Sequence, residues 1–223
     1  DDRPAGAWIA ATAADLRGRA NSTLLPNTTA FGCYDGNLIG LCERVDAPAP
    51  IASETLPRER LWKVCARAVV LCAGAHERSI AYANNDLPGT LLAGAARLYV
   101  ERYAVRPGSR AVVFTNNDSA YASALALARA GLTVAAIVDA RPETSLSGEL
   151  ARKAREAGLR IVAGAAIAGA HGRLRVTGVD VVPLSGGGAT RIECGLVCVF
   201  GGWYSAVHLI SQARGLLRYD ASL

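Results

Sequence analysis

The stretch TNNDSAY, residues 115–121, joins an apolar strand-like run to an alanine-rich helical pattern. A strand, a turn and a helix in this order bind the phosphates of a dinucleotide when glycines in the turn let backbone N–H groups reach the anion at the helix N-terminus. The turn here reads Thr115, Asn116, Asn117 and Asp118 and contains no glycine. The sequence therefore predicts the fold of a dinucleotide unit without its phosphate cradle.

Two acidic residues, Asp118 and Asp139, lie at positions that matter for dinucleotide binding. Asp118 is predicted at or near the N-cap of the helix, where its carboxylate would accept free N–H groups and place a negative charge at the position of a pyrophosphate. Asp139 ends the next predicted strand, about 20 residues on, where the ribose-binding acid of a dinucleotide unit falls. Because the glycines are absent, we favour the interpretation of Asp139 as a turn residue before Arg141.

Six cysteines raise the question of a redox or metal site. Cys194 and Cys198 are predicted in one strand, which places their Cα atoms about 13 Å apart, whereas a disulfide needs about 4.4–6.8 Å. No Cys–His set has zinc spacing. We therefore expect reduced, buried cysteines, no metal site and a cytoplasmic location. The six are Cys33, Cys42, Cys65, Cys72, Cys194 and Cys198.

The composition excludes some partners. The net charge of +5 comes from dispersed arginines, without a run of like charges or interleaved aromatic residues, so nucleic-acid binding is not expected. No uncharged apolar stretch approaches the ~18 residues that span a bilayer, so no membrane partner is expected. The start, DDRPAGAW, shows no signal peptide, and the chain has no methionine. We expect an internal piece of a longer polypeptide or a processed product.

The first part of the chain predicts a β-meander. A helix is expected over residues 8–17, and two strands over 22–34 and 37–45 flank the hairpin signal Asp35-Gly36. Residues 46–60 are expected to form a loop. A third strand then follows, with a break near Arg67 and a fully buried strand that ends at Gly74.

The second part alternates strands and helices. A helix is expected over residues 91–103, then a strand (110–115), a helix (118–130), a strand (133–139), a helix (147–157) and a strand (159–166), followed by β-like sequence to Phe200. This alternation predicts parallel β-α-β units and an α/β fold.

Longer stretches carry a family resemblance. ANNDLPG and VFTNNDSAY are its most specific motifs, and the match extends from LLPNTTAFGCYDGNLIGLCERV to GGWYSAVHLISQARGLLRYD, nearly the whole chain. With these motifs the chain resembles the α subunit of heterotetrameric sarcosine oxidase, and the related subunits that act on other secondary amines.

The resemblance implies an FAD/NAD(P)-binding Rossmann-like fold of the reductase type, with two dinucleotide-binding domains and a β-meander. It implies that residues 1–106 close the first dinucleotide domain, that 107–200 form a second one with a degenerate glycine motif, and that 201–223 return to the first. The glycine-rich unit of the first domain would lie upstream.

The resemblance also implies non-covalently bound NAD and partner β, γ and δ subunits. In the family, amine oxidation takes place at FAD in the β subunit, and electrons pass to FMN at the α/β interface and then to oxygen. FAD and FMN are therefore expected in the full complex and not on this chain alone. We expect no complete catalytic centre and no catalytic residue here.

Candidate cofactor-binding residues follow from the resemblance alone. Residues 72–75 match a strand end that touches the dinucleotide, although the usual threonine is alanine here. Residues 29–31 match a segment that flanks the adenine, and residues 201–203 match the return crossing, where small residues allow close backbone approach. Arg78 is expected to line the site or to form an inter-domain ion pair. The candidates are Thr29, Ala30, Phe31, Cys72, Ala73, Gly74, Ala75, Arg78, Gly201 and Gly202.

Two other functions stay open. A self-contained flavoprotein reductase that passes hydride between NAD(P)H and FAD would need two glycine fingerprints, and this chain shows none. A non-catalytic domain that holds other subunits is favoured by the low charged content of 19%.

Overall fold

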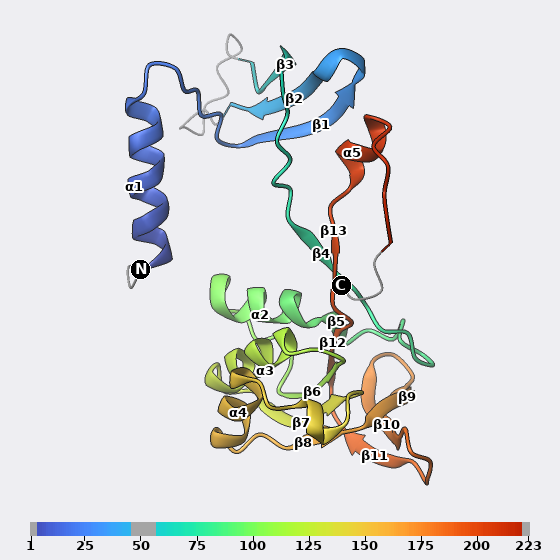
Figure 1. Cartoon of the computed structure of the whole chain (residues 1–223). Coiled ribbons are helices and arrows are strands. Elements are labelled where there is room, and N and C mark those ends of the chain that lie inside the picture. Colours follow the sequence, from blue (N-terminus) through green and yellow to red (C-terminus); the bar gives the residue numbers. More distant parts are fainter. Residues whose placement is uncertain (1–3, 46–56, 220–223) are drawn as a thin grey trace. The chain divides into compact units, whose positions relative to one another are not determined.

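The computed structural model describes residues 4–45 and 57–219, and the chain divides into two compact units. One unit comprises Asp1–Ala73 and Ala206–Leu223, and the other comprises Gly74–Ser205 (Figure 1). Most of the loop predicted over 46–60 lies outside the described residues. The predicted boundaries of the two dinucleotide domains stay a prediction.

The first unit contains helix α1 (Ala5–Gly18) and a three-stranded antiparallel sheet. The sheet has the order β1-β2-β3, with β1 at Thr28–Tyr34, β2 at Leu38–Arg44 and β3 at Glu59–Cys65. Gly36 turns the β1–β2 hairpin at φ 71°, a left-handed conformation that glycine adopts without steric cost. The predicted meander is thus confirmed. In the same unit, Gln212 of helix α5 (His208–Gln212) accepts a 3.0 Å hydrogen bond from the Cys33 backbone N–H.

The buried strand predicted to end at Gly74 is wrong. Residues 66–74 form no strand, and Val70 is 85% exposed. An apolar run becomes a buried strand only when neighbouring strands and layers cover it. No strand among the described residues pairs with this segment, so its apolar composition alone did not determine its structure.

The second unit is built on a five-stranded parallel sheet with the order β5-β12-β6-β7-β8. Strands β6 (Arg110–Thr115) and β7 (Thr133–Asp139) have the predicted bounds. The other three are β5 (Thr90–Leu92), β8 (Ile161–Ala163) and β12 (Leu196–Phe200). Pairing of all neighbours in parallel confirms the predicted α/β fold class.

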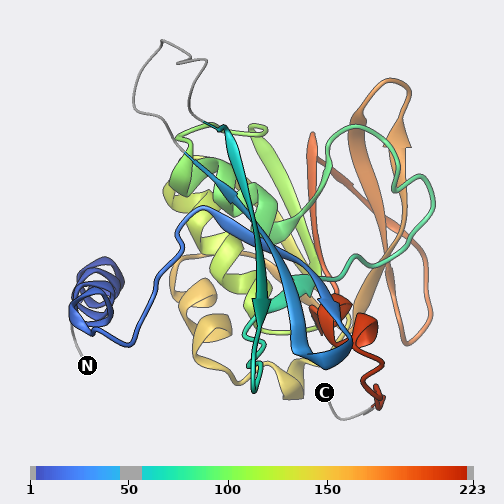
Figure 2. The ribbon, with the colours of Figure 1, turned by 90° about the horizontal axis from the view of Figure 1, so that it is seen from above.

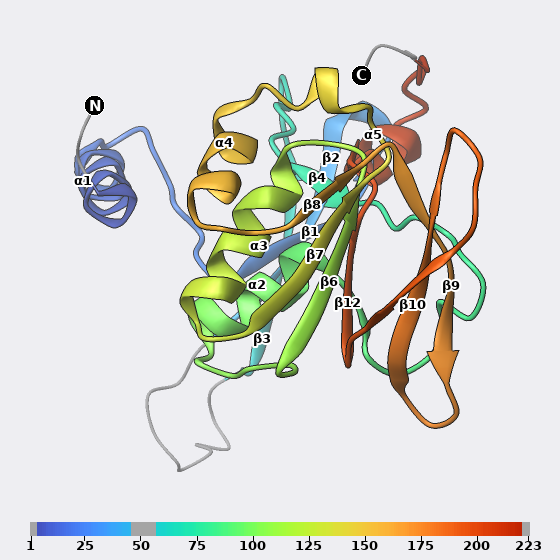
Figure 3. The same cartoon turned by 90° about the horizontal axis from the view of Figure 1, so that it is seen from below.

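Two different layers cover this sheet. Helices α2 (Ala93–Arg102), α3 (Ser119–Arg129) and α4 (Glu149–Glu156) lie on one face, and β9 (Ala165–Gly172), β10 (Val176–Pro183) and β11 (Thr190–Glu193) lie on the other (Figures 2 and 3). Side chains of β6 point alternately to the two layers. Val113 packs against the helices, whereas Val112 and Phe114 pack against the β9-β10-β11 sheet.

Two predicted elements have different bounds. The strand predicted over 159–166 is interrupted at Gly164, which has φ 61° and separates β8 from the antiparallel sheet β9-β10-β11. The helix predicted over 91–103 is preceded by β5 and runs from Ala93 to Arg102. A two-stranded antiparallel ribbon of β4 (Ala75–Glu77) and β13 (Trp203–Ser205) completes the unit. No helix in the described ranges is long and apolar enough to cross a bilayer.

Candidate functional site

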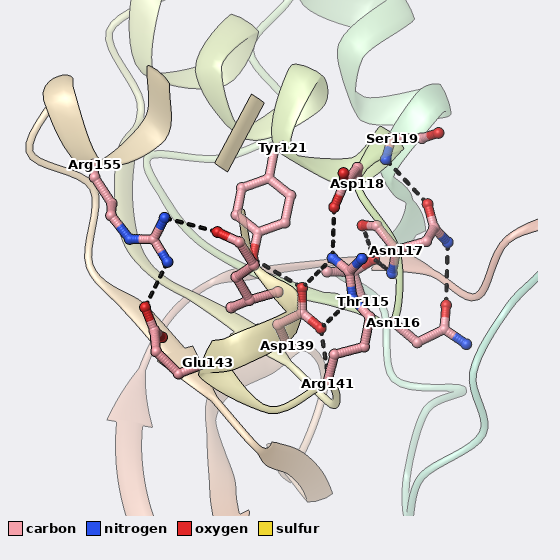
Figure 4. A network of polar contacts seen from close by, with 11 residues as sticks. Thr115, Asn116, Asn117, Asp118, Ser119, Tyr121, Asp139, Arg141, Glu143 and Arg155 are labelled. Carbon is pink, nitrogen blue, oxygen red and sulfur yellow. Dashed lines mark hydrogen bonds and ion pairs between the residues drawn. The ribbon is translucent and has the colours of Figure 1, made fainter. Parts of the chain in front are cut away.

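The carboxyl edge of the parallel sheet gathers the polar residues singled out in the sequence. Neighbouring parallel strands end at the same edge, and ligands of open α/β sheets bind in the crevice outside it. Each of three segments begins with the last residue of a strand: 115–118 at the end of β6, 139–141 at the end of β7 and 200–202 at the end of β12. We call the first two segments the β6–β7 edge (Figure 4).

The turn between β6 and α3 uses its own side chains to satisfy its backbone. The Asn117 N–H donates to Thr115 Oγ1 at 3.1 Å, and the Ser119 N–H donates to Asn117 Oδ1 at 3.0 Å. The Tyr121 N–H donates to the carbonyl of Asp118 at 3.1 Å. N–H groups that a phosphate cradle would offer to an anion are therefore engaged within the turn.

The predicted role of Asp118 as the capping side chain is wrong. Asp118 is the N-cap residue of α3, yet its side chain makes no capping hydrogen bond. Asn117 accepts from the Ser119 N–H, as given above, while Asp118 Oδ1 accepts a 2.8 Å hydrogen bond from Arg141 Nη2. The backbone of Asp118 is helical (φ −72°, ψ −24°) rather than extended, unlike a typical capping residue.

Asp139 lies at the centre of the β6–β7 edge and has no exposed surface. Its carboxylate accepts hydrogen bonds from the Arg141 backbone N–H (2.9 Å), from Arg141 Nε (3.1 Å) and Nη2 (2.8 Å), and from the Tyr121 hydroxyl (2.8 Å). The backbone bond two residues on is an Asx-turn, which supports the interpretation of Asp139 as a turn residue.

Burial and charge shift the pKa values of the groups around Asp139. Burial, and then the hydrogen bond to Asp139, raise the pKa of the Tyr121 hydroxyl far above its usual range. The hydrogen bond to Asp139 raises the pKa of the Arg141 guanidinium. Tyr121 and Arg141 are thus fixed donors, and neither can act as an acid or a base near neutral pH.

The β6–β7 edge does not fit a dinucleotide. A pyrophosphate needs free N–H groups and a positive field at the helix N-terminus. Here the N–H groups of Asn117, Ser119 and Tyr121 are engaged, and the Asp118 carboxylate stands beside the start of α3. The acid that would hold a ribose is bound to Arg141.

The ribbon of β4 and β13 brings several predicted site residues together. Ala75 pairs with Ser205, the Arg78 N–H donates to the carbonyl of Gly202 at 2.8 Å, and the Gly201 N–H donates to the carbonyl of Arg78 at 2.7 Å. A Cβ at Gly201 would lie 2.9 Å from Ile80 Cγ1 and 3.0 Å from the Ser79 carbonyl oxygen. Close backbone approach at this crossing therefore requires glycine.

Glu77 lies in the same ribbon, at the end of β4. Both of its carboxylate oxygens accept a 3.0 Å hydrogen bond from the Gly94 N–H at the start of α2. Burial raises the pKa of Glu77, and hydrogen bonds from Gly94 and Ala93 partly offset this. Glu77 thus fastens the ribbon to the N-terminus of α2.

The remaining predicted site residues belong to the first unit or to its boundary. Phe31 is the extra residue of a β-bulge, since Ala30 pairs with Leu41 and Gly32 with Gly40. Its ring lies over Gly40 and is 45% exposed. Thr29 and Ala30 precede it in β1, and Cys72 and Ala73 are exposed. Gly74 begins the second unit with φ 73° and open space beside its Cα.

Sequence reasoning missed the roles of Arg141 and Tyr121. In the sequence, Arg141 was noted only as the residue after the predicted Asp139 turn, and Tyr121 only as part of the stretch TNNDSAY. One signal was available in the sequence. Asp118 follows the end of one predicted strand, Asp139 ends the next, and Arg141 comes two residues after Asp139. That pattern indicates an internal ion pair at a shared edge.

Comparison with known proteins gives close relatives among curated sequences, although no family model matches the chain. Sarcosine oxidase subunit alpha of Corynebacterium sp. strain P-1 is 40% identical over 233 residues, which cover 100% of this chain and 23% of that protein. The subunit alpha of Rhizobium meliloti is 36% identical over 215 residues, 96% of this chain and 21% of that protein. The chain thus spans between a fifth and a quarter of the length of these relatives.

Solved structures share the fold at low identity. The bacillithiol disulfide reductase of Bacillus cereus has a TM-score of 0.59 at 14% identity, with 93% of this chain and 58% of that chain covered. The NAD-dependent persulfide reductase of A. fulgidus has a TM-score of 0.58 at 16% identity, with 90% and 35% covered. These likenesses confirm the predicted Rossmann-like fold of the two-dinucleotide-domain reductase type. Along its whole length, this chain matches a segment of the sarcosine oxidase α-subunit family.

Proposed function

We propose that this chain is the NAD-binding region of the α subunit of a multi-subunit flavoenzyme that oxidises sarcosine or a similar secondary amine. The observation that carries the proposal is 36–40% identity to sarcosine oxidase α subunits over nearly all of the chain. In the full complex, FAD and FMN would carry out the oxidation with β, γ and δ subunits, in the cytoplasm. This chain would supply a binding segment and no complete active site.

The residues proposed to hold NAD belong to other segments of the chain than the β6–β7 edge, and one of them, Gly202, lies beside Asn117 of that edge. Phe31 offers a half-exposed aromatic ring on a bulge, a type of strand irregularity that often re-aims a side chain beside a functional site. Gly74, with its left-handed backbone and open surroundings, would let a ligand approach the chain. Cys72, Ala73 and Ala75 flank it. Bound NAD would supply a nicotinamide ring that accepts hydride.

Gly201, Gly202 and Arg78 lie where the segment after β12 passes close to the segment after β4. Gly201 and Gly202 allow the close approach described above, and Gly202 has φ 99°. The backbone of Arg78 is fixed by two hydrogen bonds to these glycines, which leaves its guanidinium to meet a phosphate or a carboxylate. Thr29 and Ala30 complete the proposed set.

The proposal is tested by activity of the whole complex. The full-length subunit that contains this chain is co-expressed with its partner subunits, and oxygen consumption is measured with sarcosine, other N-methyl amines and NAD(P)H. Amine-dependent oxygen consumption that needs no added NAD(P)H is expected. Oxidation of NAD(P)H with no response to amines would overturn the proposal in favour of the flavoprotein reductase.

A second candidate function is a domain that holds other subunits, and one surface favours it. Ala95, Leu98, Tyr99, Tyr103 and Val105 line an apolar depression of about 590 Å³ on and just after α2. Tyr103 is 57% exposed and Leu98 is 47% exposed. Association with a partner subunit that resists high salt, and that Leu98→Asp abolishes, would support this role, because apolar contacts are not screened by ions.

A further inference from the structure

We infer that Arg141 is an internal occupant of the β6–β7 edge, so that this unit takes up no nicotinamide dinucleotide and receives no hydride donor there. The proposed NAD-binding residues belong to other segments, 29–31, 72–78 and 201–202, the last of which passes beside Asn117. In open α/β folds a ligand binds at this edge of the sheet, whereas here side chains of the chain itself occupy it.

The geometry shows how the edge is filled. Arg141 Nη2 lies 2.8 Å from Asp118 Oδ1, after β6, and 2.8 Å from Asp139 Oδ2, at the end of β7. One guanidinium therefore spans the space between two strand ends, where the ribose and pyrophosphate of a dinucleotide lie in a binding-competent unit (Figure 4). The Asp118 carboxylate also packs against the backbone of Gly148, at the start of α4, where a Cβ would collide with it.

The charges oppose entry of an anion. Two carboxylates and one guanidinium leave the cluster with one net negative charge. A pyrophosphate would meet that charge at a turn whose Asn117, Ser119 and Tyr121 N–H groups are already engaged. Displacing Arg141 would leave the Asp139 carboxylate, which has no exposed surface, without its main partner.

Tyr121 makes the arrangement rigid. Its side chain has no exposed surface, and its hydroxyl donates to the same Asp139 oxygen that Arg141 Nη2 contacts. Asp139 thus receives donors from α3 and from the loop after β7. To admit a ligand at this edge, Arg141 would have to release its hydrogen bonds to Asp118 and Asp139 at the same time. Losing several charge-assisted hydrogen bonds costs more free energy than one new contact with a dinucleotide would return.

Hydrogen exchange read by mass spectrometry tests the inference on the full-length subunit, with and without millimolar NADH or NADPH. The expected result is slow exchange in residues 116–121 and 139–141 that neither nucleotide changes. Slower exchange there on adding nucleotide would overturn the inference. Changes at residues 29–31 and 72–75 report on the proposed NAD site instead, so the two proposals can fail separately.

A pair of variants adds a second readout. In Arg141→Gln, exchange in residues 116–121 is expected to accelerate by about tenfold, the change produced when opening becomes easier by about 1.4 kcal/mol, with unchanged nucleotide content. Asp118→Asn changes a partly exposed carboxylate without altering its shape, and keeps the test available if Arg141→Gln does not fold. Loss of bound nucleotide in either folded variant, with exchange unchanged, would identify the edge as a binding site.

Discussion

The hydroxyl of Tyr121 lies 2.8 Å from the carboxylate of Asp139, and neither side chain has any exposed surface. The two residues come from α3 and from the end of β7, so this one hydrogen bond ties a helix to the sheet beneath it. Around it, Arg141 joins the strand ends of β6 and β7. The carboxyl ends of β6 and β7 are thus joined by a polar cluster of the unit's own side chains.

Tyr121→Phe should lower the free energy of unfolding by about 1.5–3 kcal/mol, the usual range for a hydrogen bond to a charged group. The variant keeps the ring in the core and removes only the donor to Asp139. Urea unfolding measures the change. Tyr99→Phe is the matched control, because Tyr99 is 42% exposed and its change is expected within about 0.5 kcal/mol. Equal effects in the two variants would show that the bond contributes nothing.

Arg141→Met should cost about 2–3 kcal/mol of stability, because it leaves the buried Asp139 carboxylate without its cationic partner, and the partial exposure of Arg141 moderates the loss. Arg152→Met is the control. Arg152 forms an exposed i,i+4 pair with Glu156 on α4, and such pairs contribute about 0.3–0.5 kcal/mol. A loss for Arg141→Met no larger than the control would contradict the described role of the cluster.

Gly201→Ala should destabilise the chain by about 1–3 kcal/mol, because the new methyl group would press on Ile80 and on the carbonyl of Ser79. Gly195→Ala, where an added Cβ meets nothing within 4 Å, should be nearly neutral. Thermal unfolding distinguishes the two. If both alanines are tolerated equally, residues 78–80 do not approach Gly201 as described.

Glu77 should make stability fall as pH rises. Its pKa in the folded chain is raised above the ordinary value of 4.5, so the folded state binds the proton more tightly than the unfolded state. The penalty for ionising Glu77 is therefore absent below that ordinary value and appears as pH rises through the raised pKa. Unfolding of Glu77→Gln and of the parent chain, followed from acidic to neutral pH, should show the variant gaining relative stability. The opposite trend would mean that the bonds to Gly94 outweigh burial.

The cysteines should separate into two classes by reactivity. The prediction that the cysteines are buried is wrong for Cys65 and Cys72, which are exposed, whereas Cys33, Cys194 and Cys198 are buried. Burial raises the pKa of the Cys194 thiol to about 11, and the thiolate is the reactive form. An aromatic disulfide reagent at mildly alkaline pH should label Cys65 and Cys72 at once, and the buried three only after unfolding, as read by peptide mass mapping. Early labelling of Cys194 would contradict its position in the core.

Much of the second unit could be predicted because its pattern is local. The apolar runs of β6 and β7 end at polar turns, and their bounds agree with the prediction. Residues 68–74 look equally apolar but form no strand, because a strand needs a partner that periodicity does not reveal. The sequence signal for the Arg141 cluster was indirect, since Asp118 and Arg141 meet only when β6 and β7 pair.

The most direct test of the central claim is the identity of the bound nucleotide. The purified full-length subunit that contains this chain is denatured with acid, and the released nucleotide is identified by mass spectrometry, alongside Gly201→Ala and Arg141→Gln variants. The account predicts NAD from the parent subunit, a reduced amount from Gly201→Ala and an unchanged amount from Arg141→Gln. FAD alone, or no nucleotide from the intact subunit, would contradict it.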